Sequence, residues 1–278
     1  MGLARGALCA TGGLAITRQS GQSVRVDDTA QTGWASAWQK SWDLLEEGLV
    51  PDREQRIAVL LDVVDAMVGG TPTVIDLACG TGTITCRLLE RFPLARVVAV
   101  DIDPVLLTIA SETFADDDRV RVVRADLRDP AWVDELPEQA VDAVLTATAL
   151  HWLPPEVVQR LYRDLARLVR RGGVVAHTEE MPLVEVPCLG DGLTRLRKRR
   201  TGMPRADACW DAWWEQAAQD PALAAATRQR HAVFETNYPT EEFSPPADWH
   251  ISALIEAGFA EAGVVWRSGA GAVVAALR

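Results

Sequence analysis

Two aspartates on either side of a glycine-rich turn mark the part of this chain that best suits ligand binding. Asp76 ends an apolar run and is followed by Gly80 and Gly82, while a second apolar run ends near Asp101. Glycine lets the backbone approach a ligand where a Cβ atom would collide. An acid at the tip of a second strand is where a nucleotide ribose sits in many α/β folds. We therefore predict a nucleoside-containing ligand at this turn, with its ribose on Asp101.

Two cofactor classes use such a layout. Dinucleotide enzymes need G-x-G-x-x-G, but the run from Gly80 reads Gly-Thr-Gly-Thr-Ile-Thr and lacks the third glycine. The spacing acid-x-small-x-Gly-x-Gly fits Asp76, Ala78, Gly80 and Gly82. With Asp101 following, this pattern resembles the class I S-adenosylmethionine-dependent methyltransferases, although Ala78 stands where that family often has glycine.

The order of predicted elements indicates an α/β fold. Apolar strand patterns alternate with helical ones, which is typical of a parallel sheet covered on both faces. Strands are predicted at residues 73–78, 96–102, 120–126, 141–149, 173–178, 262–267 and 272–277, with helices that include 84–92, 104–114, 155–170 and 247–258. The last two strands predict an antiparallel hairpin, which the resemblance also implies. We expect a doubly wound, mostly parallel seven-stranded sheet.

Three segments lie outside this sheet. Residues 1–32 are predicted to form a mobile extension, and two helices are expected between residues 33 and 67. Residues 181–246 are rich in Pro, Trp and Arg and show no strand alternation, so they are predicted to form a helical lid that sets substrate specificity. The core then comprises residues 33–180 and 247–278.

Composition restricts the class of partner. The chain has 278 residues and a net charge of −11, which argues against broad binding to a nucleic-acid backbone. No N/D-P-P-Y motif follows the fourth strand, and no apolar run reaches the length of a membrane span. The five cysteines lack metal-ligand spacing. We expect a cytoplasmic monomer or homodimer, without a metal, that acts on a small molecule.

The resemblance implies further cofactor contacts. An acid at Asp126 receives the adenine amino group, and the Leu127 N–H reads the ring. Ile102 packs on the adenine face, while the backbone around Thr146 faces the methionine portion.

Each acid also has a structural interpretation. Asp76 can cap the N–H groups of the turn, and Asp126 can form a turn. Asp101 can cap the helix that starts at Pro104, although Asp103 is better placed for that role.

His151 and Trp152 follow the fourth strand, where open α/β sheets bind their ligands. The Leu-His-Trp run resembles the trans-aconitate, malonyl-carrier and juvenile-hormone-acid methyltransferases, which methylate free carboxylates. In that family the Trp and a Gln of the N-terminal helix can contact the acceptor carboxylate. Trp152 matches the position of this Trp, and Gln39 is a candidate for the Gln. His151 is the predicted base for a hydroxyl acceptor. The structural interpretations are a loop histidine bonded to backbone and a tryptophan packed under the lid.

Tryptophans form two helical stripes, Trp34, Trp38 and Trp42, and Trp210, Trp213 and Trp214. The stripes either pack on each other or on the core, or form an aromatic wall over an apolar acceptor, which would place Trp34, Trp38 and Trp213 at the substrate. The basic run Arg195–Arg200 is either a solvated face or an anion clamp.

These residues predict a small-molecule methyltransferase that methylates a carboxylate or hydroxyl oxygen by in-line displacement. The alternative is a cofactor-binding or cyclising protein that keeps the fold and has lost methyl transfer.

Overall fold

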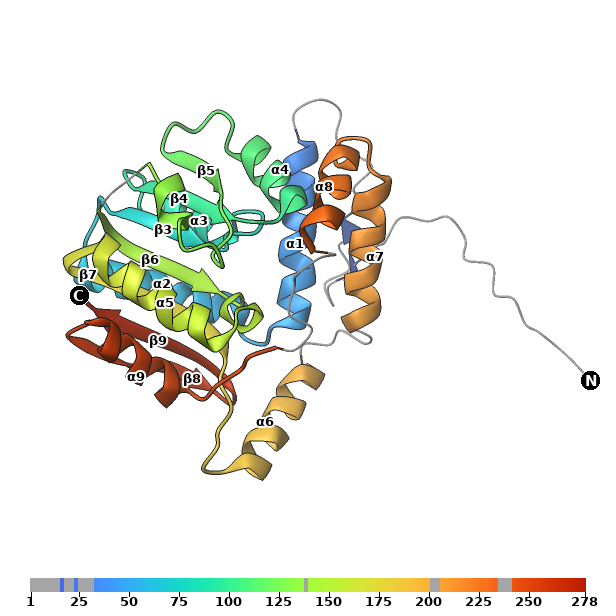
Figure 1. Cartoon of the computed structure of the whole chain (residues 1–278). Helices are drawn as coiled ribbons and strands as arrows, with labels where there is room; N and C mark the ends of the chain where they lie inside the picture. The colour runs from blue at the N-terminus through green and yellow to red at the C-terminus, as the bar shows by residue number, and fades with distance from the viewer. Residues whose placement is uncertain (1–15, 18–22, 25–32, 138–139, 201–205, 235–241) are drawn as a thin grey trace, which may run out of the picture.

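The computed structural model describes residues 16–17, 23–24, 33–137, 140–200, 206–234 and 242–278 (Figure 1). Apart from the short strands β1 (Ile16–Thr17) and β2 (Ser23–Val24), the extension predicted over residues 1–32 lies outside the described residues. Within the described ranges, no helix combines the length and apolar character needed to cross a lipid bilayer.

A seven-stranded sheet in the order β5-β4-β3-β6-β7-β9-β8 forms the centre of the molecule. Neighbouring strands from β5 to β7 are parallel, whereas β9 runs antiparallel to both β7 and β8. This confirms the predicted mostly parallel sheet with a C-terminal hairpin. The strands are β3 (Thr73–Leu77), β4 (Arg96–Asp101), β5 (Val120–Arg124), β6 (Val141–Ala147), β7 (Val169–Glu180), β8 (Glu261–Ser268) and β9 (Gly271–Leu277).

Alternating side chains divide the core into two layers, because successive residues of a strand face opposite sides of the sheet. Ile75 and Leu77 pack with helices α5 (Pro155–Leu168) and α9 (Ala247–Ala257). Val74 packs on the other face with α2 (Arg53–Met67) and α3 (Thr83–Arg91). The helices on each face hold the sheet rigid below the carboxyl ends of β3, β4 and β6.

Local capping explains where several helices begin and end. Helix α4 (Pro104–Thr113) starts after Asp103, whose Oδ1 accepts a hydrogen bond from the Val105 N–H at 2.8 Å. The cap is therefore Asp103 and not Asp101. Helix α9 ends at Gly258, which has φ of 106°. The helix predicted over residues 155–170 ends earlier, at Leu168, because Val169 already pairs with β6.

A second apolar core lies beside the sheet. Helix α1 (Trp34–Leu49) packs on α4 and on α7 (Ala206–Gln219), and α8 (Ala224–Phe234) packs on α4 and α7, on the right of Figure 1. Its buried residues include Trp38, Trp42, Val105, Ile109 and Trp213. A helix that precedes β3 thus packs with helices that lie between β7 and β8 in the chain.

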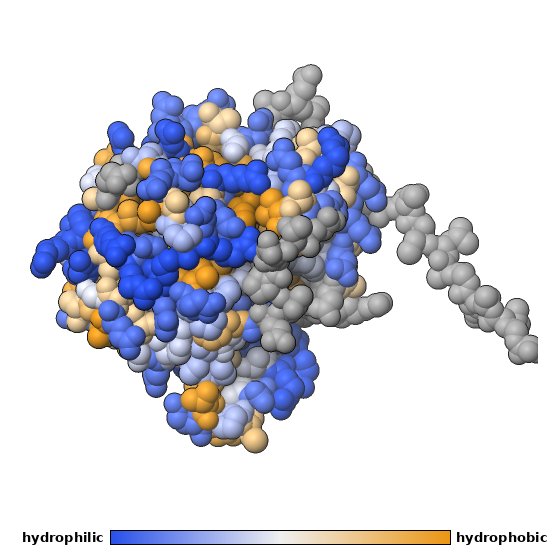
Figure 2. Space-filling model, viewed as in Figure 1, coloured by the Kyte–Doolittle hydropathy of each residue, from blue (hydrophilic) through white to orange (hydrophobic). Residues whose placement is uncertain are grey.

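Helix α6 (Pro187–Arg200) projects away from the rest of the molecule (Figure 1). Leu189 and Leu193 are exposed on it, and Figure 2 shows orange and blue residues side by side in that region. Arg197 forms an ion pair with Asp52, while Lys198 reaches the large cavity described below. The predicted basic run therefore divides between the surface and the cavity.

Candidate active site

One cavity of about 660 Å³ lies at the carboxyl ends of β3, β4, β6 and β7. One side, which we call the strand-tip wall, is formed by residues at the carboxyl ends of β3 to β7 and just after them: Asp76, Ala78, Gly80, Asp101, Ile102, Asp103, Ala125, Asp126, Leu127, Ala147, Thr148, Ala149, His151 and Glu179. The other side, which we call the cap wall, comes from helices: Trp42, Glu46, Leu49, Arg53, Arg56, Lys198, Trp210, Trp214, Arg230 and Phe234.

Asp76 is fixed by one carboxylate oxygen and leaves the other without a partner. Its Oδ2 accepts hydrogen bonds from Thr85 N at 3.0 Å and Thr85 Oγ1 at 2.7 Å, which is the predicted capping role. Its Oδ1 is buried and has no hydrogen-bond partner among the described residues. Burial raises the pKa of Asp76 to about 6, although the Thr85 hydrogen bonds act in the opposite direction. A ligand that donates a hydrogen bond satisfies this oxygen.

The glycine-rich turn is held open toward the cavity at Gly80. A Cβ atom there would lie 3.6 Å from Trp42 Nε1 and 3.9 Å from Leu106 Cδ1. Both of these residues line the cavity, so the Cβ atom would occupy cavity space. Ala78 has φ of 55°, a left-handed conformation that costs a residue with a Cβ about 1–2 kcal/mol.

Gly82 was predicted to contact the cofactor, but it does not line the cavity. Its φ is 90°, and a Cβ atom would collide with the ring of Phe114. The glycine is required by the backbone conformation and by packing below the turn. Its position in the motif could not reveal that distinction.

Asp101 joins the end of β4 to the turn. Its Oδ2 accepts a hydrogen bond from Gly80 N at 2.8 Å, and its Oδ1 accepts from Ile102 N and Asp103 N at 2.7 and 2.8 Å. Burial raises its pKa to about 6, and the nearby Asp103 adds to this effect. Each carboxylate oxygen has more than one acceptor site, so Asp101 can hold the turn and still accept from a hydroxyl.

The third strand tip carries Asp126 and Leu127, and both line the cavity with Ile102. The Asp126 carboxylate accepts the Arg128 backbone N–H at 2.9 Å and also pairs with the Arg128 guanidinium at 2.8 Å. The turn-forming interpretation therefore describes its present contacts. Burial acts against ionisation of Asp126, but Arg128 outweighs it and lowers the pKa.

At the fourth strand tip the cavity lining begins one residue after Thr146. The Thr146 side chain is 2% exposed and does not line the cavity, whereas Ala147, Thr148 and Ala149 do. Thr148 has φ of 51°, so the chain turns sharply after β6. Of the backbone predicted to face the methionine portion, around Thr146 and Ala147, Ala147 lines the cavity and Thr146 does not.

His151 is oriented by a carboxylate from the next strand. Its Nδ1 lies 2.8 Å from Glu179 Oε2, and Glu179 Oε1 accepts the N–H groups of Ala149 and Leu150 at 2.8 Å. Glu179 is 3% exposed. With Nδ1 used by Glu179, Nε2 is the ring nitrogen left for a ligand. This differs from the structural interpretation of a histidine bonded to backbone.

Burial lowers the pKa of His151, but the hydrogen bond and charge of Glu179 outweigh it, so the pKa lies above its ordinary value of 6.5. Glu242 and Glu46 add to the increase. Trp152 lies beside His151, with ring centroids 4.9 Å apart, and it also lines the cavity. Both predicted acceptor-side residues are therefore at the cavity.

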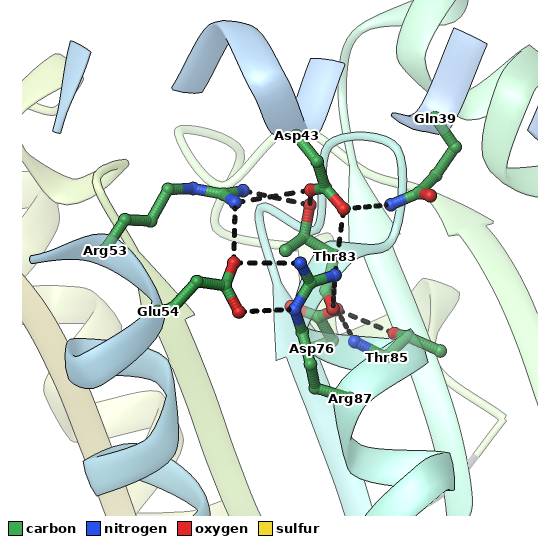
Figure 3. Close-up of polar contacts among 8 residues, drawn as sticks. All are labelled: Gln39, Asp43, Arg53, Glu54, Asp76, Thr83, Thr85 and Arg87. Carbon is green, nitrogen blue, oxygen red and sulfur yellow. Dashed lines mark hydrogen bonds and ion pairs between the residues drawn. The ribbon is translucent and has the colours of Figure 1, made fainter. Parts of the chain in front are cut away.

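Asp43 of α1 links the cap wall to the glycine-rich turn, as Figure 3 shows. It accepts hydrogen bonds from Thr83 Oγ1 at 2.6 Å, Arg87 at 2.9 Å and Arg53 at 3.3 Å. Gln39, predicted to bind the acceptor, donates to Asp43 at 3.0 Å and does not line the cavity. Gln39 therefore supports this network, because its amide faces Asp43 along the same helix.

The two tryptophan stripes pack on each other, as the structural interpretation predicted. Trp38 and Trp42 have ring centroids 5.1 and 4.9 Å from that of Trp213. Trp38 also donates to Asp220, and Trp213 donates to Ser41. The predicted substrate contacts Trp34, Trp38 and Trp213 do not line the cavity; the tryptophans that do are Trp42, Trp152, Trp210 and Trp214.

Several cavity residues were not anticipated from the sequence. Glu179 follows a predicted strand, so the rule that ligands bind at carboxyl ends of strands could have found it. Glu46 lies four residues after Trp42 and so on the same helix face, which was a usable signal. Arg53 and Arg56 carried no comparable signal.

Comparison with known proteins finds a family match over most of the strand-tip wall. A family model described as a methyltransferase domain matches residues 74–173, which include β3 to β6 and the first residues of β7. Residues 74–173 are therefore similar to a methyltransferase domain. The match does not include α1, α2, α6, α7 and α8, which supply the cap wall.

Two relatives align with part of this chain. A trans-aconitate 2-methyltransferase from Azoarcus sp. (strain BH72) is 39% identical over 104 residues, and one from Escherichia coli O7:K1 is 35% identical over 103 residues. Each alignment spans 37% of this chain and 37% of the length of the relative.

Solved structures share the fold over a larger part of the chain. An O-methyltransferase family protein from Burkholderia thailandensis has a TM-score of 0.54 at 19% identity, covering 88% of this chain and 59% of its own. Human N-acetylserotonin methyltransferase in complex with S-adenosylmethionine has a TM-score of 0.52 at 16% identity, covering 88% of this chain and 55% of its own. At these identities the likeness is one of fold.

Proposed function

We propose that this protein is an S-adenosylmethionine-dependent methyltransferase that methylates an oxygen of a small-molecule acceptor, either a carboxylate or a hydroxyl. The observation that carries the proposal is a single cavity that joins the glycine-rich turn to the His151–Glu179 pair. A donor of a methyl group and an acceptor oxygen can therefore meet in one enclosed space. The trans-aconitate 2-methyltransferase relatives support the same reaction class.

The residues of the strand-tip wall fit S-adenosylmethionine. We assign the ribose hydroxyls to Asp101 and the adenine to Asp126, Leu127 and Ile102, all of which line the cavity. Asp76 Oδ1, which has no partner among the described residues, accepts a hydrogen bond from the amino group at the methionine end of the cofactor. When bound, the cofactor supplies a methyl group on a sulfonium with a good leaving group, so the protein chiefly aligns the reactants and excludes water.

His151 is the side chain proposed to meet the acceptor oxygen. As the imidazolium, it donates from Nε2 to a carboxylate, which is already ionised and needs no base. As the neutral imidazole, it takes the proton of a hydroxyl through the same nitrogen. The cap wall, with Trp42, Trp210 and Trp214, shields this region from water. We also propose that residues 181–246 act as the predicted lid.

Titration calorimetry with S-adenosylhomocysteine tests the cofactor assignment. Asp101→Ala is expected to weaken binding about 100-fold, because two charge-assisted hydrogen bonds to the ribose are lost. Asp118→Ala, an exposed acid outside the cavity, is the control and should bind like the wild type. Tight binding of NAD by the wild type, without binding of S-adenosylhomocysteine, contradicts the proposal.

Asp76→Asn is a companion variant, because Asp101 also supports the backbone of the turn. The asparagine oxygen can accept from Thr85, and its amide nitrogen replaces the buried Oδ1. With its pKa raised to about 6, Asp76 binds more protons in the native state, so its ionisation opposes folding above that pH. At pH 7.5 the variant should keep or slightly raise Tm while binding S-adenosylhomocysteine at least about tenfold more weakly.

Methyl transfer itself separates the enzyme from the alternative of a binding or cyclising protein. The wild type is incubated with methyl-labelled cofactor and a mixture of carboxylic and hydroxylated metabolites. Label in a small-molecule product supports the enzyme. Binding of the cofactor without transfer to any member of the mixture favours the alternative.

A further inference from the structure

We propose that Glu46 selects a neutral hydroxyl group over a carboxylate as the methyl acceptor. This inference rests on the proposed function and narrows it to one acceptor class. Glu46 belongs to α1 and lies one helical turn after Trp42. Because Trp42 lies beside Gly80 of the cofactor turn, the next turn of α1 reaches the acceptor side of the cavity.

The carboxylate of Glu46 is enclosed but still reaches the cavity. The residue is 9% exposed and lines the cavity. Among the described residues, no hydrogen bond or ion pair engages its oxygens, and they are not among the fully buried polar atoms that lack a partner. A buried charge without a partner is costly, so a ligand group that can pair with it gains affinity.

Neighbouring charges show what kind of ligand this carboxylate tolerates. Burial raises the pKa of Glu46 and the charge of Asp43 adds to the increase, whereas Arg53 and His151 act in the opposite direction. The charge of Glu46 therefore acts on a ligand at pH values above this raised pKa, and the binding test below is made at pH 8.5. Arg53 is already paired with Asp43, and His151 is held by Glu179. An ionised carboxylate acceptor would add another negative charge beside Glu46, whereas a hydroxyl adds none.

Glu46 also supports the proton transfer that a hydroxyl acceptor requires. As the acceptor oxygen bonds to the methyl carbon, the carbon–sulfur bond breaks and its electron pair goes to sulfur. The hydroxyl proton passes to His151 Nε2. Glu179 lies 2.8 Å from Nδ1 of this imidazolium, and the charges of Glu179, Glu242 and Glu46 raise the pKa of His151.

The test compares wild type, Glu46→Gln and the control Glu47→Gln, each saturated with S-adenosylhomocysteine. Ligand-observed NMR measures binding of two matched pairs, 4-ethylphenol with 4-ethylbenzoate and 3-phenylpropanol with 3-phenylpropanoate. Wild type and Glu47→Gln should bind the hydroxyl member at least about tenfold more tightly. Removing the charge in Glu46→Gln should bring the two members within about threefold of each other.

Turnover gives a second readout once one hydroxyl acceptor is found. Glu46→Gln should move the acidic limb of the kcat/KM profile to lower pH, because His151 loses one of its neighbouring carboxylates. A wild type that prefers the carboxylates, that binds no probe, or whose preference survives in Glu46→Gln overturns the inference. Failure of S-adenosylhomocysteine to bind at all would instead remove the proposed function.

Discussion

The two walls of the cavity are built in opposite ways. The strand-tip wall comes from short turns after β3, β4, β5 and β6, and its positions are set by the sheet beneath it. The cap wall comes from α1, α2, α6, α7 and α8, which are far apart in the sequence and meet through a separate apolar core. The position of the strand-tip wall therefore follows from the fold of the sheet, whereas the cap wall depends on how the helices of this chain pack together.

The Asp43 network is where the two walls meet, so breaking it tests the comparison most strongly. Asp43→Ala leaves Arg53, Arg87 and Thr83 without their shared acceptor. Because the Asp43 side chain is 16% exposed, we expect a loss of about 2 kcal/mol, or roughly 4–8 °C in Tm. Thermal unfolding measures the effect.

Acid unfolding gives an independent check on Asp43. Burial opposes its ionisation, but Arg53, Thr83 and Arg87 outweigh burial, so its pKa lies below 3.8. The stabilisation is therefore present above pH 3.8 and is lost as the pH falls through the lowered pKa. Asp65→Ala, which removes an exposed partner of Arg91, should change the free energy of unfolding by less than about 0.5 kcal/mol. Equal effects of the two variants would contradict the linking role.

A smaller effect is expected within the strand-tip wall at Glu179. Glu179→Gln keeps the size of the side chain but removes the charge that favours protonated His151. For a hydroxyl acceptor, the acidic limb of kcat/KM should shift to lower pH, and the maximal rate should fall about tenfold as His151 becomes a weaker base. A pH profile identical to that of the wild type would show that His151 is not the base.

The smallest effect is expected at Ala78, inside the motif itself. Glycine relieves the left-handed strain at this position but raises the entropy of the unfolded chain. Ala78→Gly should therefore change the free energy of unfolding by less than about 1 kcal/mol, measured in urea, and leave S-adenosylhomocysteine affinity within about twofold. A large loss of affinity would show that the Cβ atom of Ala78 contacts the cofactor.

Sequence predicted the strand-tip wall better than the cap wall, for a physical reason. Asp76, Gly80 and Asp101 sit at fixed distances from buried strands, so alternation and glycine position locate them. Trp213 and Trp214 are adjacent in sequence, yet one packs on α1 and the other lines the cavity. Periodicity places a residue on a helix face but does not say which neighbour that face meets.

The Gln39 prediction was wrong for the same reason. The residue that faces His151 from α1 is Glu46, two helical turns further along. The family resemblance indicated a glutamine in the N-terminal helix, but it did not indicate which position of this helix faces the cavity. Only the packing of α1 against α4 and α7 fixes which side chain enters the cavity.

One backbone contact restricts how this protein can be recombined with others. The N–H of Phe243 donates to the carbonyl oxygen of His151 at 2.8 Å. The segment that leads into α9 therefore supports the loop that carries His151, the proposed base. A chimera that exchanges α6 to α8 for foreign helices should keep Phe243 and the residues up to Pro246 native, or replace them together with the His151 loop.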